Sequence, residues 1–161
     1  MKPARFDYYS PSSRDEALEL LGQYGDDAKI LAGGQSLMPM MNMRLVRPKV
    51  VIDINRIADL SHISPRRDAG LAIGAMTRQR ELERSALVLE TAPLLSWAIP
   101  YIGHFQIRNR GTVGGSLAHS DPAAEIPAVC LTLETEFELA NSGGERTVKA
   151  GDFFFNHLTT A

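Results

Sequence analysis

Two glycine pairs are the residues of this sequence best suited to chemistry. Gly33-Gly34 follows a short apolar run and precedes the hydroxyl of Ser36, and Gly114-Gly115 also precedes a serine. Glycine lets a backbone approach a ligand closely and adopt positive φ angles, and the free N–H groups at a helix start attract anions. Either pair alone is typical of an ordinary turn. Together they indicate a clamp that holds a diphosphate from two sides.

Neither pair belongs to a common nucleotide-binding loop. No lysine follows in the way a P-loop requires, and neither pair has the G-x-G-x-x-G spacing of a dinucleotide fingerprint. The histidines form no pair four residues apart with a nearby carboxylate, so we expect no metal site. The single cysteine, Cys130, excludes an internal disulfide and a self-contained iron–sulfur cluster, and we predict that it packs in a core.

Composition narrows the class of protein. The chain has 161 residues, 44% hydrophobic and 22% charged, which is ordinary for one globular domain or two small lobes. A formal net charge of −2 argues against a nucleic-acid-binding surface, because such a surface needs clustered Lys and Arg. The N-terminus has no apolar signal-peptide core, and no apolar run approaches the ~20 residues of a membrane span. We therefore expect a cytoplasmic location.

The elements around the first glycine pair predict a small βαβ-like lobe over residues 1–57. Ser13 and Glu16 form a capping box that starts a helix with one apolar face. A Met-rich helix over 35–45, capped by Ser36, is expected to follow the glycine pair and to place its methionines in the core. Short strands are predicted at residues 6–9, 28–32 and 50–54.

Residues 58–161 predict a larger lobe with a mainly antiparallel sheet and flanking helices. Thr77 is expected to cap a charged helix, and Pro93 and Pro122 each to open another. The chain ends on 158–161 without a Gly, Pro or charge, which suggests a continuation. Hairpins are predicted for 62–64 with 71–74 and for 136–139 with 146–149.

Arg108 and Arg110 precede the second glycine pair. We interpret them as surface charges or as ion-pair partners of Asp121 or Glu125. The alternative is that they hold the glycine loop in place or meet a partner subunit.

Three stretches, AGGQSLMPMMNMRL, IGAMTRQRELE and IRNRGTVGGSLAHSDPAAEIPA, carry a resemblance to one known family. They are similar to the FAD-binding (medium) subunit of molybdenum hydroxylases, the carbon monoxide dehydrogenase and xanthine dehydrogenase family. The resemblance covers residues 2–161 and implies an α+β fold of the PCMH type, with FAD held between two lobes. The family's C-terminal domain follows a motif resembling FFFNHLTTA, so it is absent from this sequence.

The resemblance also implies which residues contact FAD, none of them with a catalytic role. Backbone amides of the first motif would contact the pyrophosphate, and the acidic position Glu125 would bind the adenosine ribose or nearby polar groups, with Asp121 as a second candidate. We expect the two motifs to face each other across one pocket. The first motif comprises Ala32, Gly33, Gly34, Gln35, Ser36 and Leu37, and the second comprises Thr112, Gly114, Gly115, Ser116 and His119.

The function implied by the resemblance is electron transfer. A large molybdenum-cofactor subunit would oxidise the substrate, a small 2Fe-2S subunit would relay the electrons, and FAD on this chain would pass them to an acceptor. Two alternatives remain open: a non-catalytic scaffold or interaction module with the same fold, and a free-standing flavin oxidase. The sequence leaves the substrate and the acceptor undetermined.

Overall fold

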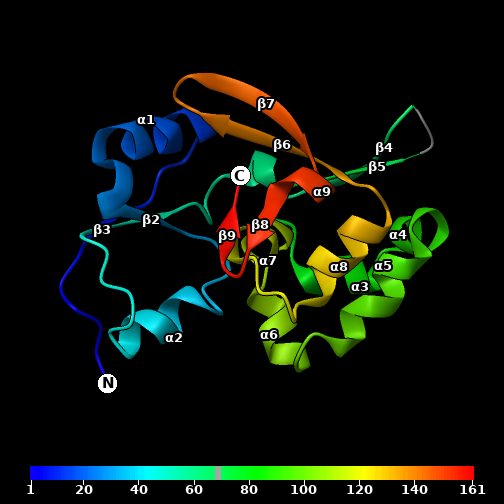
Figure 1. The fold of residues 1–161 in the computed structure, drawn as a ribbon, viewed down its shortest axis with the longest axis horizontal. Coiled ribbons are helices and arrows are strands. Elements are labelled where there is room, and N and C mark those ends of the chain that lie inside the picture. Colours follow the sequence, from blue (N-terminus) through cyan, green and yellow to red (C-terminus); the bar gives the residue numbers. More distant parts are fainter. Residues whose placement is uncertain (68–69) are drawn as a thin grey trace.

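A computed structural model of the protein describes residues 1–67 and 70–161 (Figure 1). Helices and short strands alternate along the chain, and the predicted α+β class is confirmed. Among the described residues, no helix is both long and apolar enough to cross a membrane.

Residues 1–57 contain a three-stranded parallel sheet, with every predicted strand present. The elements are β1 (Asp7–Tyr9), α1 (Arg14–Tyr24), the 3-10 turn η1 (Gly25–Asp27), β2 (Ala28–Leu31), α2 (Leu37–Asn42) and β3 (Val50–Asp53). The strand order is β1-β3-β2, so the last strand in sequence lies in the centre. Helix α1 begins as predicted, because the Ser13 hydroxyl accepts a hydrogen bond from the Glu16 N–H at 3.2 Å.

In residues 58–67 and 70–161 the structure is mainly helical, with three antiparallel strand pairs. The helices are η2 (Ala58–Leu60), α3 (Gln79–Arg84), α4 (Ala86–Thr91), α5 (Pro93–Ala98), η3 (Ile99–Tyr101), α6 (Phe105–Arg110), α7 (Val113–His119), α8 (Glu125–Thr132) and α9 (Ala150–Phe153). The strand pairs are β4 (Ile63–Pro65) with β5 (Leu71–Ile73), β6 (Glu136–Asn141) with β7 (Gly144–Lys149), and β8 (Phe154–Asn156) with β9 (Thr159–Thr160). Both predicted hairpins are confirmed, and the antiparallel pairs are separate two-stranded ladders.

Two predicted helix starts are wrong. Thr77 does not cap α3, because its buried hydroxyl accepts from the His62 N–H at 3.1 Å and donates to the His62 carbonyl at 2.9 Å. The helix begins at Gln79, where the Glu81 carboxylate accepts from the Arg78 N–H at 3.0 Å. Pro122 lies in a turn, and α8 begins three residues later.

The predicted Met-rich helix is shorter than expected. It begins at Leu37, and the Ser36 hydroxyl makes no capping hydrogen bond. Met41 is buried, as expected of a core methionine, whereas Met43 is half exposed. The loop before the helix offers the Gly34 and Ser36 carbonyls to the N–H groups of Met38 and Met40, whereas its own N–H groups stay outside the helical bonding pattern.

Two hydrophobic clusters organise the interior. In the first, α1 packs Ala17 against Val50 and Ile52 of the parallel sheet. The second fills the helical part and includes the buried Cys130, so the prediction that this cysteine packs in a core is confirmed. Phe137 meets Phe153 edge-to-face there, with ring centroids 4.8 Å apart.

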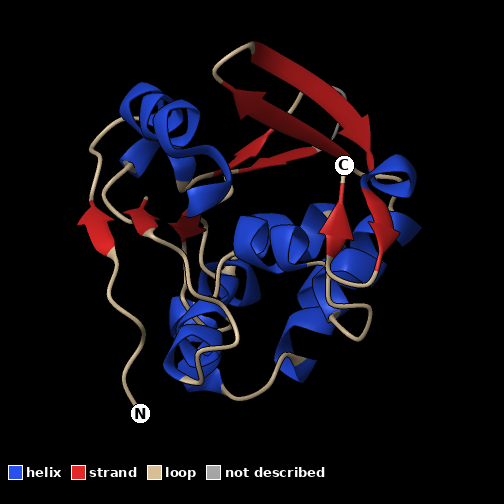
Figure 2. Cartoon of the chain, turned by 60° about the vertical axis from the view of Figure 1, so that its left-hand side comes forward, coloured by secondary structure: helices blue, strands red, loops and turns tan. Residues whose placement is uncertain are grey.

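The β6–β7 hairpin spans both clusters. At its base, Phe137 and Val148 pack against the helical core, and at its tip Glu145 forms an ion pair with Arg14 of α1 at 2.6 Å. Figures 1 and 2 show the hairpin extending from α9 toward α1.

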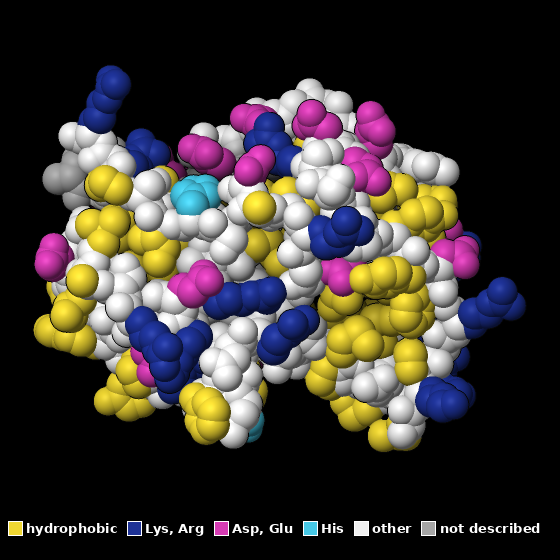
Figure 3. All heavy atoms as spheres, turned by 180° about the vertical axis from the view of Figure 1, so that it is seen from behind, with side chains coloured by type: hydrophobic (Ala, Val, Ile, Leu, Met, Phe, Trp, Pro, Cys, Tyr) yellow, Lys and Arg dark blue, Asp and Glu magenta, His cyan; other side chains and the backbone are white. Residues whose placement is uncertain are grey.

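The surface behind the view of Figure 1 carries charges of both signs. Figure 3 shows acidic and basic side chains interspersed there, with hydrophobic side chains in several groups. Large exposed side chains of the helical part include Trp97, Tyr101 and Phe105, each more than half exposed.

Candidate functional site

The first glycine loop, residues 32–36, joins β2 to α2. Gly34 has a φ of +73°, a left-handed conformation that glycine adopts readily. Within the described part of the chain, the N–H groups of Gly33, Gly34, Gln35 and Ser36 donate no hydrogen bond to another residue. Successive unpaired N–H groups in a turn form an anion-binding concavity. This loop therefore has the donors that a phosphate group requires.

The second glycine stretch, residues 112–116, is fixed by the segment before α3. The Gly114 N–H donates to the Ala75 carbonyl at 2.8 Å, and the Val113 N–H donates to the Thr77 carbonyl at 3.1 Å. A Cβ at Gly114 would lie 2.7 Å from the Ala75 Cβ, so only glycine fits there. This glycine serves close packing, and its N–H is already paired within the protein.

The N–H groups of Gly115 and Ser116 are also paired. Thr112 caps α7, with its hydroxyl accepting from the Gly115 N–H at 3.1 Å and its carbonyl accepting from the Ser116 N–H at 3.1 Å. Contacts from residues 113–116 to a cofactor would therefore come from Cα atoms and side chains. The predicted contacts themselves remain predictions.

The structure brings the two glycine stretches into direct contact, although about 80 residues separate them in the sequence. A Cβ at the buried Gly33 would collide with the Arg110 carbonyl oxygen and lie 2.9 Å from the Gly111 Cα. A Cβ at Gly115 would lie 3.6 Å from the Ala32 Cβ. Loop and helix thus touch where the absence of side chains permits it.

The three remaining candidates lie at or beyond the end of α7. His119 is the last residue of α7 and is partly buried. The Asp121 carboxylate accepts from the Ala123 N–H at 2.9 Å in the following turn, and Glu125 is the first residue of α8. Neither carboxylate forms an ion pair with Arg108 or Arg110.

The structure corrects the interpretation of Arg108 as a surface charge or an ion-pair partner of Asp121 or Glu125. The Arg108 side chain is buried and donates from Nε to Glu83 Oε2 at 3.0 Å and from Nη1 to the Ile102 carbonyl at 3.0 Å. It is therefore neither a surface charge nor a partner of Asp121 or Glu125. The alternative interpretation is correct for this residue, because its contacts hold α6, which leads directly into the second glycine stretch.

A polar network that the sequence analysis missed joins the first glycine loop to the end of α6, just before the second glycine stretch. Asn55 donates from Nδ2 to the Ala32 carbonyl at 2.8 Å, behind the first loop. Arg78 donates from Nη2 to Asn55 Oδ1 at 2.6 Å and from Nη1 to the Arg110 carbonyl at 2.6 Å. Burial lowers the pKa of Arg78 from its ordinary value. The only sequence signal was the position of Arg78 within IGAMTRQRELE, where a solvated face was expected.

Asp53 anchors the same network to the sheet. Its carboxylate accepts from Tyr8 at 2.5 Å and from Asn55 Nδ2 at 2.6 Å. Burial pushes the pKa of Asp53 upward, but the hydrogen bonds from Tyr8 and Asn55 outweigh it, and the net shift is downward. Asp53 is thus held as a carboxylate that orients the Asn55 amide.

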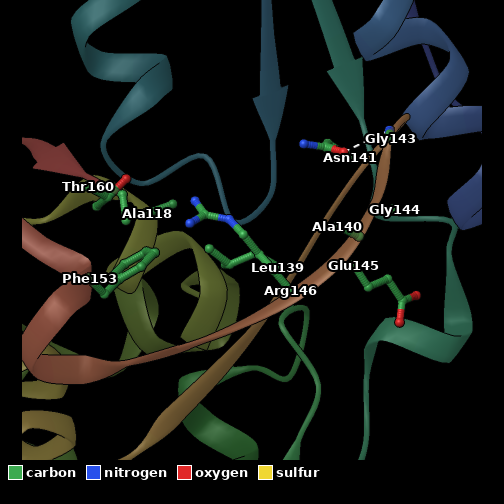
Figure 4. Close-up of a pocket in the computed structure, with 11 residues that line it drawn as sticks. Ala118, Leu139, Ala140, Asn141, Gly143, Gly144, Glu145, Arg146, Phe153 and Thr160 are labelled. Atoms are coloured by element: carbon green, nitrogen blue, oxygen red, sulfur yellow. Dashed lines mark hydrogen bonds between the residues drawn. The ribbon is translucent and has the colours of Figure 1, made fainter.

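A cavity of about 620 Å³ lies beside α7. Figure 4 shows Arg146 of β7 extending into this space, toward Ala118 and Thr160, whereas Glu145 points the other way. The lining residues are Ala118, Leu139, Ala140, Asn141, Gly143, Gly144, Glu145, Arg146, Phe153, Thr160 and Ala161.

Comparison with known proteins identifies the family. The model of the family described as the FAD binding domain in molybdopterin dehydrogenase matches residues 4–161. The chain belongs to this family. The cofactor of its site is accordingly FAD, and the unpaired N–H groups of the first loop, with the tight contact at Gly33, fit the pyrophosphate of such a dinucleotide.

Individual members of the family are similar over the whole of this chain. It is 46% identical to the 6-hydroxypseudooxynicotine dehydrogenase complex subunit alpha of Paenarthrobacter nicotinovorans, covering 100% of this chain and 54% of that protein. It is also 46% identical to the carbon monoxide dehydrogenase medium chain of Hydrogenophaga pseudoflava, covering 99% and 55%. The chain thus spans about half the length of the relatives it matches.

Solved structures show the same fold. The carbon monoxide dehydrogenase of Hydrogenophaga pseudoflava superposes with a TM-score of 0.96, over 99% of this chain and 55% of that one. Quinoline 2-oxidoreductase from Pseudomonas putida 86 superposes with a TM-score of 0.95 at 38% identity, over 99% and 55%. The PCMH-type fold expected from the sequence is therefore confirmed.

Proposed function

We propose that this chain is the FAD-binding, electron-transferring part of a molybdenum-containing dehydrogenase. The observation that carries the proposal is the first glycine loop, which has four unpaired N–H groups among the described residues and contacts the second glycine stretch. Family membership and the dehydrogenase names of the relatives support the same role. The network through Asn55 and Arg78 supports it further, because it fixes both stretches in one arrangement.

In this proposal, the protein binds and orients the cofactor and supplies no nucleophile. The N–H groups of the first loop bind the pyrophosphate, and Glu125 or Asp121 takes polar groups of the adenosine end. FAD, when bound, supplies the redox chemistry. The proposed contact residues are Ala32, Gly33, Gly34, Gln35, Ser36, Leu37, Thr112, Gly114, Gly115, Ser116, His119, Asp121 and Glu125.

The proposed partners are a large molybdenum-cofactor subunit and a small 2Fe-2S subunit. Relatives are named as medium chains or as subunits of dehydrogenase complexes, which supports an assembly of several chains. The chain has one cysteine, fewer than the four thiolates a cluster normally takes, so electrons must come from clusters held elsewhere. We also propose that residues 1–57 and 58–161 act as the two lobes that hold FAD.

The proposal is tested with two glycine variants and a matched control. Gly33→Ala places a Cβ against the Arg110 carbonyl, and Gly34→Ala forces a side chain into a left-handed conformation. Gly151→Ala is the control, because nothing lies within 4 Å of its added Cβ. We expect flavin absorbance per chain to fall at least tenfold in the first two variants and to be unchanged in the third.

The same experiment separates the alternatives. A wild-type protein that takes up no FAD, alone or with its partner subunits, would contradict the proposal. If it nevertheless assembled with those subunits, the scaffold reading would be favoured. Hydrogen peroxide formed from a small organic substrate by the chain alone would favour a free-standing oxidase.

A further inference from the structure

Arg146 is a cation at an inward-facing position of the β6–β7 hairpin. In the ladder, Leu139 pairs with Arg146 and Phe137 pairs with Val148. Directly opposite residues of an antiparallel pair share a face, and so do residues two apart on one strand. Phe137 and Val148 pack in the helical core, so Arg146 lies on the same face of the hairpin. Unlike those two residues, Arg146 remains exposed, beyond the edge of the core.

The guanidinium of Arg146 has no protein partner among the described residues. No hydrogen bond or ion pair joins it to another described side chain or carbonyl. The neighbouring acid, Glu145, lies on the outer face, where it pairs with Arg14 at 2.6 Å. Figure 4 shows the two side chains of the strand leaving it in opposite directions. A positive charge is thus presented to the cavity, with its donors available.

The cavity adjoins the contact between the two glycine stretches. Ala118 of α7 lines the cavity with Arg146, and Gly115, one turn earlier on the same helix, meets Ala32 of the first loop. Residues three apart are neighbours on one helix face, about 4.5 Å apart along the axis. A dinucleotide whose pyrophosphate lies on the first loop therefore has this cavity within reach of its flavin end.

The lining of the cavity suits a flat ring with an electron-rich edge. Leu139, Phe153 and Ala118 provide apolar surface, and Arg146 provides a planar group with several donors. A volume of about 620 Å³ lies within the range of ligand pockets. The N–H groups of the first loop already provide donors for the pyrophosphate. The Arg146 guanidinium is therefore available to the flavin ring.

We propose that Arg146 contacts the flavin ring and stabilises the negative charge that the ring gains on reduction. The inference rests on the proposed function. Two electrons from the reductant and one proton from solvent would leave the ring with one additional negative charge, which the guanidinium of Arg146 would neutralise. Arg146 therefore favours the reduced cofactor over the oxidised one.

The test compares Arg146→Gln, which removes the charge, with Arg146→Lys, which keeps it. Lys149→Gln is the matched control, because it removes one positive charge from the outer face of the same strand. FAD affinity is measured by fluorescence titration, ADP affinity by calorimetry, and the flavin reduction potential by dye equilibration. We expect Arg146→Gln to weaken the reduced relative to the oxidised complex about tenfold, which lowers the potential by about 30 mV for a two-electron couple.

Arg146→Lys should have a flavin reduction potential closer to the wild-type value than Arg146→Gln has. Lys149→Gln should have the wild-type potential. An unchanged potential in Arg146→Gln, or an equal loss of ADP and FAD binding, would overturn the assignment; the second result would place Arg146 on the pyrophosphate. Failure of the wild type to bind FAD would overturn the proposed function as well. Normal FAD binding with an insensitive potential would overturn only the role of Arg146.

Discussion

The guanidinium of Arg108 donates two hydrogen bonds to the carboxylate of Glu83, from Nε to Oε2 at 3.0 Å and from Nη2 to Oε1 at 3.3 Å. This two-point contact joins α6 to α3, and both helices flank the second glycine stretch. Charge-assisted bidentate pairs fix geometry as well as adding energy. The pair therefore sets the position of the chain that enters the second glycine stretch.

Removing Arg108 should destabilise the fold. Arg108→Ala leaves the partly buried Glu83 carboxylate with Arg80 as its remaining partner and frees the Ile102 carbonyl. The loss of these charge-assisted hydrogen bonds should cost about 2 kcal/mol. Urea unfolding measures this change. Arg80→Gln is the control, since Arg80 reaches Glu83 from a more exposed position and should cost less than about 1 kcal/mol. Equal costs for the two variants would contradict the assigned role.

The same pair predicts how stability depends on pH. Hydrogen bonding from Arg108, with a smaller contribution from Arg80, lowers the pKa of Glu83 below its ordinary 4.5. A depressed folded-state pKa contributes stability above the unfolded-state value and loses it as the pH falls through the folded-state value. The Tm of the wild type should therefore fall below pH 4.5 more steeply than that of Glu83→Gln. If Tm fell with pH equally in both proteins, Glu83 would not be the cause of the loss of stability in acid.

Arg78 should affect FAD binding through geometry. Lysine has one ammonium in place of a planar fork and cannot reproduce both bonds, to Asn55 Oδ1 and to the Arg110 carbonyl. We expect Arg78→Lys and Arg78→Ala each to weaken FAD binding about tenfold, while the exposed Arg84→Ala has no effect. Fluorescence titration reads the affinity, and thermal unfolding provides the separate stability measurement. Wild-type FAD affinity in Arg78→Lys would show that only the positive charge of Arg78 matters, and not its planar geometry.

Cys130 should be unreactive in the folded protein. Burial raises the pKa of its thiol to about 11, so the thiolate is scarce at pH 8. A disulfide reagent such as DTNB should label less than a tenth of the native protein in an hour and all of it in urea. Rapid labelling of the native chain would show that α8 opens readily.

Local signals explain which elements were predictable. Ser13 and Glu16 define a helix start within four residues, and the turn at 141–144 defines its hairpin, so both predictions held. Thr77 was misread because its partner His62 is 15 residues away, and the Arg108 partner Glu83 is 25 away. A sequence shows side-chain types but not which distant groups a fold brings to them.

The candidate site also contains features that the sequence predicted and features that it did not. The glycine stretches stand out because close backbone contact leaves a compositional trace, as at Gly33 against Arg110. The Gly114 N–H pairs with Ala75, and Arg78 bridges the loop and α6, but the sequence shows no sign of either contact. Alanine and arginine are common in any surface helix or loop. Residues that position the site were therefore harder to predict than the loops that form it.

The order β1-β3-β2 has a consequence for synthesis of the chain. The outer strands share no hydrogen bonds with each other and pair only with β3, which ends at Asp53. At about 5–20 residues per second, a nascent chain carries β1 and β2 for roughly 1–4 s before their common partner has been made. The loop destined for the cofactor thus emerges from the ribosome on an unpaired strand, and its shape is settled only when the central strand arrives.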